Sequence, residues 1–259
     1  MKIAVVQFTI DAVNLEENCQ KVSNLIDSQP NCDLYLLPEL WTCGYIQEQW
    51  LSIAENETPK ALTWMSREAL RRNILIGGSI IFKESDGGLV NRFMLFDRVG
   101  SLICSYDKAH LFKPLSEHEY LVGGLKLPPV VVVDGLRISP AICYDLRFPE
   151  MFRRVALKGV DVYLVSSQWP KPRRKILEVL AQARAIENQA LLVLSNSIGV
   201  DSSGNDFCGG SGFFDPYGDS IQVSDIEGVV VQEVCIDDLS KARVQLRVID
   251  DREIGVDFD

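Results

Sequence analysis

Short apolar runs alternate with amphipathic segments along the first part of the chain. Residues 3–8, interrupted only by Gln7, predict a buried strand. Apolar residues then recur at helical spacing over residues 15–26, and residues 34–37 form a second fully apolar run before Pro38. This order predicts a β-α-β unit at the start of the chain.

The middle of the chain continues this pattern and then changes. Thr58-Pro59 is a good helix start, and we expect the chain to return to a strand at residues 74–78. Further strands are expected at residues 79–83 and 92–97, around the turn residues Asp86-Gly87-Gly88, and at residues 101–106. These strands are predicted to add to the sheet in antiparallel fashion.

A second series of strands and helices follows. The expected strands are 130–133, 138–143, 162–165 and 191–194, and the expected helices begin at Pro149 and at Pro172. The two series look like a loose duplication, and no linker or low-complexity segment divides the chain. We therefore expect residues 1–259 to form one α/β domain with helices packed on sheets. Periodicity alone leaves the number of layers open.

Composition narrows the classes of partner. The net charge of −10 argues against nucleic acid or anionic membrane, because phosphate binding needs a dense basic face. The first apolar run is too short to span a membrane and lacks a signal-peptide cleavage site. We expect a small-molecule ligand, with no nucleic-acid or membrane partner.

Cysteine usage indicates the compartment. The seven cysteines are an odd number without a CxxC pair, and only two histidines accompany them. This pattern is typical of a reduced, cytoplasmic protein without a zinc site. The cysteines are Cys19, Cys32, Cys43, Cys104, Cys143, Cys208 and Cys235.

One of these cysteines stands at the end of a predicted strand, where the polar turn after Cys143 is marked by Pro149. A side chain there is held by the sheet behind it and faces a cleft, as a covalent nucleophile requires. Glu39 and Lys108 stand at two other strand ends, and they would supply a base and a cation for an oxyanion. Each residue taken alone also fits a structural role: Cys143 as a buried thiol, Glu39 as a helix cap and Lys108 as a solvated strand end.

The sequence around these three residues resembles the signature blocks of the nitrilase (carbon–nitrogen hydrolase) superfamily. The blocks are Leu37-Pro38-Glu39-Leu40, Tyr106-Asp107-Lys108-Ala109-His110-Leu111-Phe112 and Cys143-Tyr144-Asp145-Leu146-Arg147-Phe148-Pro149-Glu150. The resemblance extends over nearly the whole chain, including residues 41–45, 168–170, 183–189 and 209–219. It implies a four-layer α-β-β-α sandwich, no metal or organic cofactor, and a homodimer or larger homo-oligomer formed through the helical face around the cysteine helix.

The resemblance also assigns roles. It implies that Glu39 is the general base, Lys108 the oxyanion donor and Cys143 the nucleophile, with the backbone N–H of Tyr144 as a second oxyanion donor. Glu117 matches a second glutamate that the family places beside the lysine. The reaction implied is amide hydrolysis through a thioester.

The expected substrate follows from Arg147, four residues after the cysteine. This arginine resembles the one with which the family clamps a substrate carboxylate, and a guanidinium group binds carboxylate in a bidentate fashion. The blocks look most like ω-amidases, which hydrolyse the terminal amide of α-keto acids such as 2-oxoglutaramate and 2-oxosuccinamate. Trp169, with Trp41 and Tyr45, is expected to line the pocket.

Several alternatives stay open at this point. Arg147 could instead pair with Asp145 or Glu150, and Arg173 or Arg174 could bind the carboxylate in its place. A nitrile, neutral-amide or N-carbamoyl amino acid hydrolase would keep the same triad with a different pocket. A non-catalytic or redox-sensing protein would keep the three residues only as a structural group.

Overall fold

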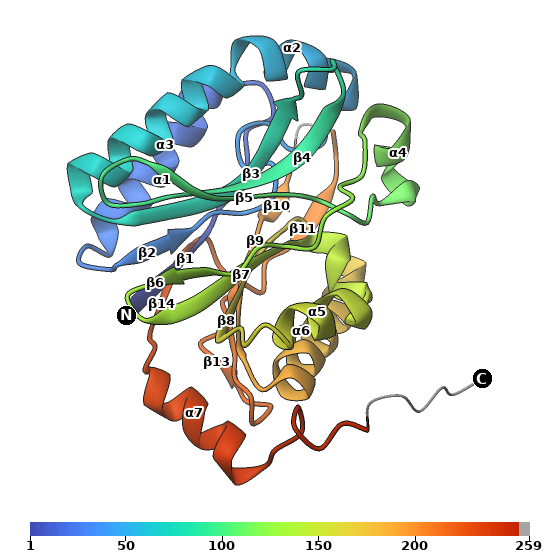
Figure 1. Ribbon diagram of the computed structural model, residues 1–259. Coiled ribbons are helices and arrows are strands. Elements are labelled where there is room, and N and C mark those ends of the chain that lie inside the picture. Colours follow the sequence, from blue (N-terminus) through green and yellow to red (C-terminus); the bar gives the residue numbers. More distant parts are fainter. Residues whose placement is uncertain (202, 254–259) are drawn as a thin grey trace.

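Two six-stranded sheets pack face to face, with helices covering the outer face of each (Figure 1). The computed structural model describes residues 1–201 and 203–253. The first sheet has the order β14-β1-β2-β3-β4-β5, the second has the order β13-β12-β9-β8-β7-β6, and β10 and β11 form a separate hairpin. The arrangement is the α-β-β-α sandwich that the family resemblance implies.

The strands are β1 (Lys2–Gln7), β2 (Leu34–Leu36), β3 (Leu75–Lys83), β4 (Leu89–Phe96), β5 (Leu102–Asp107), β6 (Val131–Val133), β7 (Leu136–Ile142), β8 (Val162–Ser167), β9 (Leu191–Asn196), β10 (Ile198–Val200), β11 (Asp206–Cys208), β12 (Gly212–Phe214), β13 (Ser220–Ile221) and β14 (Gly228–Glu233). The α-helices are α1 (Leu15–Ser28), α2 (Trp50–Asn56), α3 (Thr58–Arg72), α4 (Glu117–Tyr120), α5 (Pro149–Ala156), α6 (Arg174–Asn188) and α7 (Ile236–Gln245). Short 3₁₀ turns are η1 (Gln47–Gln49), η2 (Lys113–Leu115), η3 (Cys143–Arg147) and η4 (Lys171–Arg173).

Each sheet is built around three parallel strands. In the first sheet β1, β2 and β3 run parallel, and in the second β7, β8 and β9 run parallel. Helices connect these strands, as parallel pairs require, and antiparallel strands complete each edge. The two predicted β-α-β series therefore lie in two different sheets, one series in each.

The apolar runs are continuous because both faces of the central strands are covered. Along β1, Ile3 and Val5 belong to the core between the sheets, whereas Ala4 and Val6 pack toward α1 and α3. The side chains of a strand alternate between its faces, so a strand buried on both sides shows no polar alternation. Each such aliphatic side chain contributes roughly 1.5–3 kcal/mol on burial.

One sequence prediction is wrong. Residues 74–78 and 79–83 were expected to be two strands, but they form the single strand β3, which pairs with β4 along its length. Gly78 lies inside this strand and does not end it. The glycine is needed there because the turn that carries Glu39 packs closely against it. A Cβ atom there would lie 2.8 Å from Leu37 Cβ and 3.0 Å from Trp41 Cδ1.

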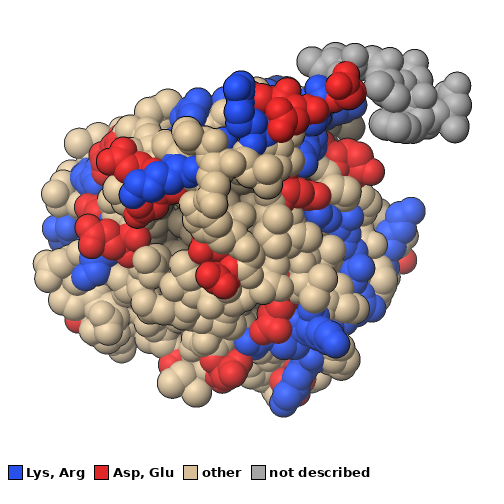
Figure 2. Space-filling view, turned by 90° about the horizontal axis from the view of Figure 1, so that it is seen from below, with Lys and Arg blue, Asp and Glu red and all other residues tan. Residues whose placement is uncertain are grey.

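The surface carries charges of both signs. Figure 2 shows Lys and Arg side chains interspersed with Asp and Glu around the margins of a broad uncharged area. None of the described helices is long and apolar enough to cross a membrane.

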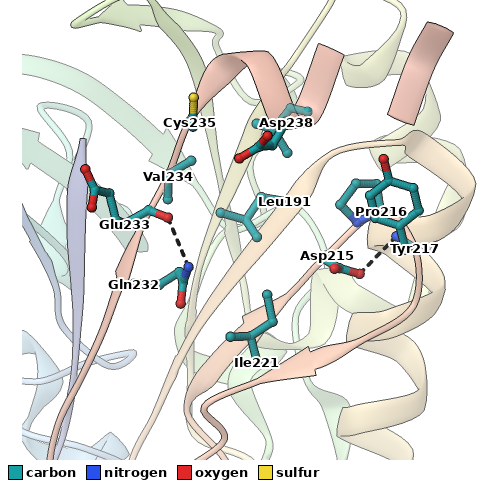
Figure 3. Close-up of a pocket in the computed structure, with 11 residues that line it drawn as sticks. Leu191, Asp215, Pro216, Tyr217, Ile221, Gln232, Glu233, Val234, Cys235 and Asp238 are labelled. Atoms are coloured by element: carbon teal, nitrogen blue, oxygen red, sulfur yellow. Dashed lines mark hydrogen bonds between the residues drawn. The ribbon is translucent and has the colours of Figure 1, made fainter. Parts of the chain in front are cut away.

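A hollow of about 580 Å³ opens between the edge strands β13 and β14 and helix α7 (Figure 3). Leu191, Tyr217, Ile221 and Leu239 line it, with Cys235 at its border. Its polar groups are largely engaged with their neighbours; for example, Gln232 donates to the Glu233 carbonyl at 3.0 Å. This hollow is structural in character and contains none of the predicted triad.

Candidate active site

Cys143 stands directly after β7, where the chain turns sharply into η3. Its backbone has φ +46°, a left-handed conformation that a residue with a side chain seldom adopts. Asp145 stabilises this turn by accepting a hydrogen bond of 3.0 Å from the Ile142 N–H. Such strain concentrates at functional sites, and here it presents a thiol that is only 6% exposed.

Glu39 lies just beyond β2, at the joint between the two sheets. Its backbone N–H donates to the Ser167 carbonyl at 3.3 Å, and its own carbonyl accepts from Gln168 Nε2 at 2.6 Å. Both partners follow or end β8 in the opposite sheet. These bonds fix the Glu39 side chain against the strand end that neighbours the cysteine strand.

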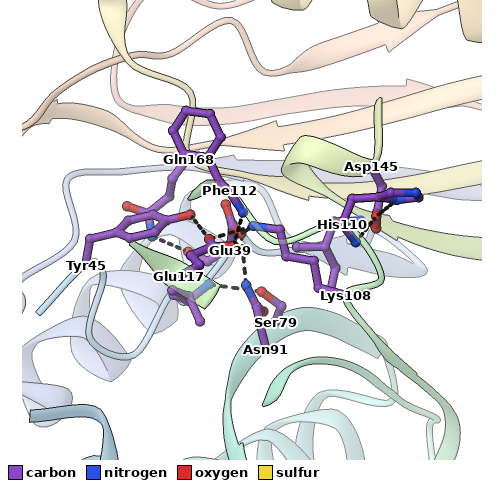
Figure 4. A network of polar contacts seen from close by, with 12 residues as sticks. Glu39, Tyr45, Ser79, Asn91, Lys108, His110, Phe112, Glu117, Asp145 and Gln168 are labelled. Carbon is purple, nitrogen blue, oxygen red and sulfur yellow. Dashed lines mark hydrogen bonds and ion pairs between the residues drawn. The ribbon is translucent and has the colours of Figure 1, made fainter. Parts of the chain in front are cut away.

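Lys108 follows β5 and is completely buried. Its Nζ lies 2.7 Å from Glu39 Oε1 and 2.7 Å from Glu117 Oε1 (Figure 4). Asn91 of β4 adds two bonds, since its carbonyl accepts from the Lys108 N–H at 2.9 Å and its Nδ2 donates to Glu39 Oε1 at 2.9 Å. The ammonium is thus held between two carboxylates in a fixed position.

Glu117 is a buried residue at the start of α4 and not an exposed loop residue. Its Oε1 also accepts from the Tyr45 hydroxyl at 2.7 Å, and its Oε2 accepts from the Phe112 N–H at 2.7 Å (Figure 4). Both oxygens of Glu117 are therefore occupied. Sequence reasoning assigned Tyr45 to the pocket and did not find its bond to Glu117.

Burial raises the pKa of Glu39; the Lys108 charge opposes this shift and the Glu117 charge adds to it. Burial also raises the pKa of the Cys143 thiol well above its ordinary range, helped by the Glu39 charge and opposed by Lys108. For Lys108, burial lowers the pKa, but the two carboxylates outweigh it and leave the pKa raised. The resting site holds an ammonium and a neutral thiol.

A thiol with a raised pKa needs a base, and Glu39 is the candidate. The Glu39 charge helps to raise the pKa of the Cys143 thiol, which indicates that the two groups lie near one another. Glu39 Oε2 is buried and has no hydrogen-bond partner within the described part of the chain. One carboxylate oxygen is thus available to take a proton.

A small, narrow pocket opens in front of Cys143. It shares no lining residue with the hollow beside α7. The predicted substrate residues Tyr144, Arg147 and Trp169 all line it, and so does Arg173. The full lining is Phe112, Cys143, Tyr144, Arg147, Gln168, Trp169, Pro170 and Arg173.

Arg147 turns its guanidinium over Trp169, 5.1 Å from the ring centroid, and forms no ion pair with any described residue. The alternative ion pair with Asp145 is not formed because that carboxylate is occupied by the Tyr106 hydroxyl at 2.9 Å and by His110 Nδ1 at 2.8 Å. Arg174 lies outside the lining of this pocket and pairs with Glu178 at 2.6 Å.

The expectation that Trp41 lines the pocket is wrong. Trp41 is fully buried and packs against Trp64 of α3, with ring centroids 5.2 Å apart, in the core on the helix side of the first sheet. Trp41 lies in the turn after β2, where Leu40 has φ +44° and the alternation of a strand no longer applies, and its ring packs with Leu37 in the helix-side core.

No group of three or more His, Cys, Asp or Glu side chains in residues 1–201 and 203–253 has the arrangement of a metal site. The chemistry at hand is that of a thiol, two carboxylates and an ammonium in a closed pocket. This set can form and break an acyl bond on sulfur.

Comparisons with known proteins agree with this geometry. The family model described as carbon–nitrogen hydrolase matches residues 2–245. The 2-oxoglutaramate amidase of Bacillus subtilis (strain 168) is 34% identical over 253 residues, which cover 96% of each chain. Omega-amidase YafV of Escherichia coli (strain K12) is 34% identical over 227 residues, 87% of this chain and 85% of that one.

A solved structure of the same superfamily has a very similar fold. XC1258 from Xanthomonas campestris, a CN-hydrolase superfamily protein with an arsenic adduct in the active site, superposes with a TM-score of 0.91. Its sequence is 28% identical, and the match covers 98% of this chain and 97% of the other. The chain belongs to the carbon–nitrogen hydrolase family, and the predicted enzyme class is confirmed.

Proposed function

We propose that the protein is an ω-amidase, which hydrolyses the terminal amide of a short α-keto acid such as 2-oxoglutaramate or 2-oxosuccinamate to the dicarboxylic acid and ammonia. The observation that carries the proposal is the buried Glu39–Lys108 pair beside the Cys143 thiol, at the base of a pocket lined by arginine. The two similar amidases named above support the choice of substrate.

The first half of the reaction forms a thioester. Glu39 takes the thiol proton as Cys143 Sγ attacks the amide carbonyl carbon. The resulting oxyanion is stabilised by the Lys108 ammonium and the backbone N–H of Tyr144. The carbon–nitrogen bond then breaks, and protonated Glu39 gives its proton to the nitrogen, which leaves as ammonia.

The second half releases the acid. Glu39, again a carboxylate, removes a proton from water as the water oxygen attacks the thioester carbonyl. The carbon–sulfur bond breaks, the acid departs and the proton returns to Cys143. Glu117 takes no proton in this scheme, because both of its oxygens are engaged in holding Lys108, Tyr45 and Phe112.

The pocket favours a small anionic substrate. Arg147 forms no ion pair with any described residue, so its guanidinium fork is available to bind a carboxylate at the pocket. A nitrile or neutral-amide hydrolase would not require a charged group there. The seven cysteines are all free, which suits the reducing conditions of the cytoplasm.

The test is ammonia release from 2-oxoglutaramate, 2-oxosuccinamate, an uncharged short amide, a nitrile and an N-carbamoyl amino acid. We expect the keto-acid amides to have the highest kcat/KM, and the methyl ester of 2-oxoglutaramate to be a poor substrate. Equal turnover of the acid and its ester, or a higher kcat/KM for the nitrile or carbamoyl compound, would refute the proposal.

A further inference from the structure

Three of the basic residues in the segment after β8 differ in their ion-pair partners. They are Lys171, Arg173 and Arg174. Lys171 Nζ pairs with Asp206 Oδ2 at 3.2 Å. Arg174 pairs with Glu178 and with Asp225, at 2.6 Å and 2.8 Å. Arg173 forms no ion pair with any described residue, and it alone of the three lines the pocket in front of Cys143.

Arg173 is nevertheless held in place by an aromatic ring. Its guanidinium lies over Phe112, 5.2 Å from the ring centroid, and Phe112 lines the same pocket. Arg147 is held in the same way over Trp169. Two guanidinium groups from different segments thus reach one small pocket, each oriented by a ring rather than by a carboxylate.

Like charges repel, so two guanidinium groups that line one pocket carry an energetic penalty. A ligand that offers acceptors to both groups removes the penalty. The 2-oxo acid end of the proposed substrate carries three oxygens, two on the carboxylate and one on the keto group. One arginine fork binds two oxygens side by side, so the third needs another donor.

We propose that Arg173 is that donor and binds the 2-oxo oxygen, while Arg147 takes the carboxylate. Arg173 is then the residue that distinguishes an α-keto acid amide from the plain acid amide of the same length. This assignment rests on the proposed function, since it names the part of the substrate that each guanidinium recognises.

The test compares 2-oxoglutaramate with glutaramate, which lacks only the oxo group. Replacing Arg173 with Gln should lower kcat/KM for 2-oxoglutaramate about tenfold to one-hundredfold and leave glutaramate nearly unchanged, because a hydrogen bond from a charged donor is lost. Arg147→Lys should lower both. Lys171→Gln is the matched control from the same turn, and it should leave both substrates at wild-type rates.

A binding measurement keeps the test independent of turnover. Cys143→Ala should bind 2-oxoglutarate more tightly than glutarate in calorimetry, and adding Arg173→Gln should abolish this preference. An Arg173 variant that loses both substrates equally, or an unchanged preference in the double variant, would overturn the assignment. If wild type fails to hydrolyse 2-oxoglutaramate while the binding preference depends on Arg173, the proposed function falls and the recognition role stands.

Discussion

Glu39 and Glu117 share one lysine, yet their surroundings give them different chemistry. Glu117 uses both oxygens, for Lys108, Tyr45 and Phe112. Glu39 uses Oε1 for Lys108 and Asn91, and its Oε2 has no hydrogen-bond partner in the described residues. A proton acceptor needs a free oxygen, so these surroundings favour Glu39 as the base of the proposed reaction and Glu117 as the residue that positions the lysine.

The size of the Lys108 head group is as important as its charge. Lys108→Arg keeps a cation but replaces a compact ammonium, 2.7 Å from each carboxylate, with a larger planar fork in a fully buried site. We expect kcat to fall by about 10²–10³, as for loss of an oxyanion donor. Steady-state ammonia release measures this, with Lys171→Arg as control. Activity near wild type in Lys108→Arg would contradict the oxyanion role.

The pH profile should report the environment of Glu39. Activity needs Glu39 unprotonated, so kcat/KM falls as the pH drops through its raised pKa. The Glu117 charge helps to raise that pKa, and Glu117→Gln should therefore move the acid limb to lower pH. Asn91→Leu should move it to higher pH, because the donor to the carboxylate is lost.

The two variants serve as mutual controls, since a merely structural disturbance would not shift the limb in opposite directions. Residual activity in the variants is enough for this test, because it measures the pH at which kcat/KM falls and not the maximal value of kcat/KM. An acid limb that stays at the wild-type pH in both variants would show that another group controls activity.

The three strand-end residues could be predicted from sequence, but their supporting residues could not. Glu39, Lys108 and Cys143 stand at the ends of predicted strands, and the resemblance to the family's signature blocks singles them out. Asn91 is a single polar residue inside a strand, and its two bonds depend on the β4–β5 pairing, which the sequence does not reveal. Three of the four bonds of Asp145 likewise come from a distant segment, from Tyr106 and His110.

At the scale of elements, Asp145 joins the end of β5 to the turn after β7. It accepts from the Tyr106 hydroxyl at 2.9 Å and from the Ile142 N–H at 3.0 Å, and His110 contacts it through Nδ1 at 2.8 Å. The lysine strand lies in one sheet and the cysteine strand in the other. This buried carboxylate therefore ties the segment that carries Lys108 to the turn that carries Cys143.

Asp145→Asn should weaken this joint, because the amide brings donors to groups that are themselves donors. We expect a loss of about 1–3 kcal/mol in the free energy of unfolding, measured by urea denaturation, together with a large fall in kcat. Asp97→Asn is a matched control in an exposed turn, where the carboxylate also accepts two backbone N–H bonds. Equal effects of the two changes would show that Asp145 has no special role.

The elements of the two β-α-β series were predicted, including the three-residue strands β2 and β6, whereas β10 to β14 and α7 were not. The parallel strands are apolar on both faces and the connecting helices carry clear stripes, so both β-α-β series were found. Strands β10 to β13 have two or three residues each, too few for any period. They exist because neighbouring strands pair with them, as β12 pairs with β9. Tertiary contacts of this kind are absent from local sequence.

At the scale of the whole molecule, the outer face of α6 bears an apolar stripe. Ile176, Val179 and Ile186 recur at helical spacing and are 43%, 53% and 45% exposed. Exposed apolar side chains in a contiguous row are typical of an interface. We propose that this face joins a second copy of the chain, in line with the homo-oligomer that the family resemblance implies.

Val179→Glu should therefore lower the mass in solution, because each partner would bury a charge at the contact. Sedimentation velocity measures the change. Val99→Glu, at a turn where the side chain is 68% exposed, is the control and should leave the mass unchanged. A wild-type protein that sediments as a monomer, or a Val179 variant that sediments like wild type, would contradict the proposal.

The central claim is that Cys143 carries the acyl group during hydrolysis. Mass spectrometry of protein quenched during turnover of 2-oxoglutaramate tests it most directly. Cys43 and Cys104 are internal controls because they are buried thiols whose pKa shifts owe nothing to Glu39 or Lys108. We expect the acyl mass on the Cys143 peptide alone, and neither adduct nor ammonia release in Cys143→Ala. An adduct on Cys43 or Cys104, or undiminished turnover in Cys143→Ala, would contradict the account.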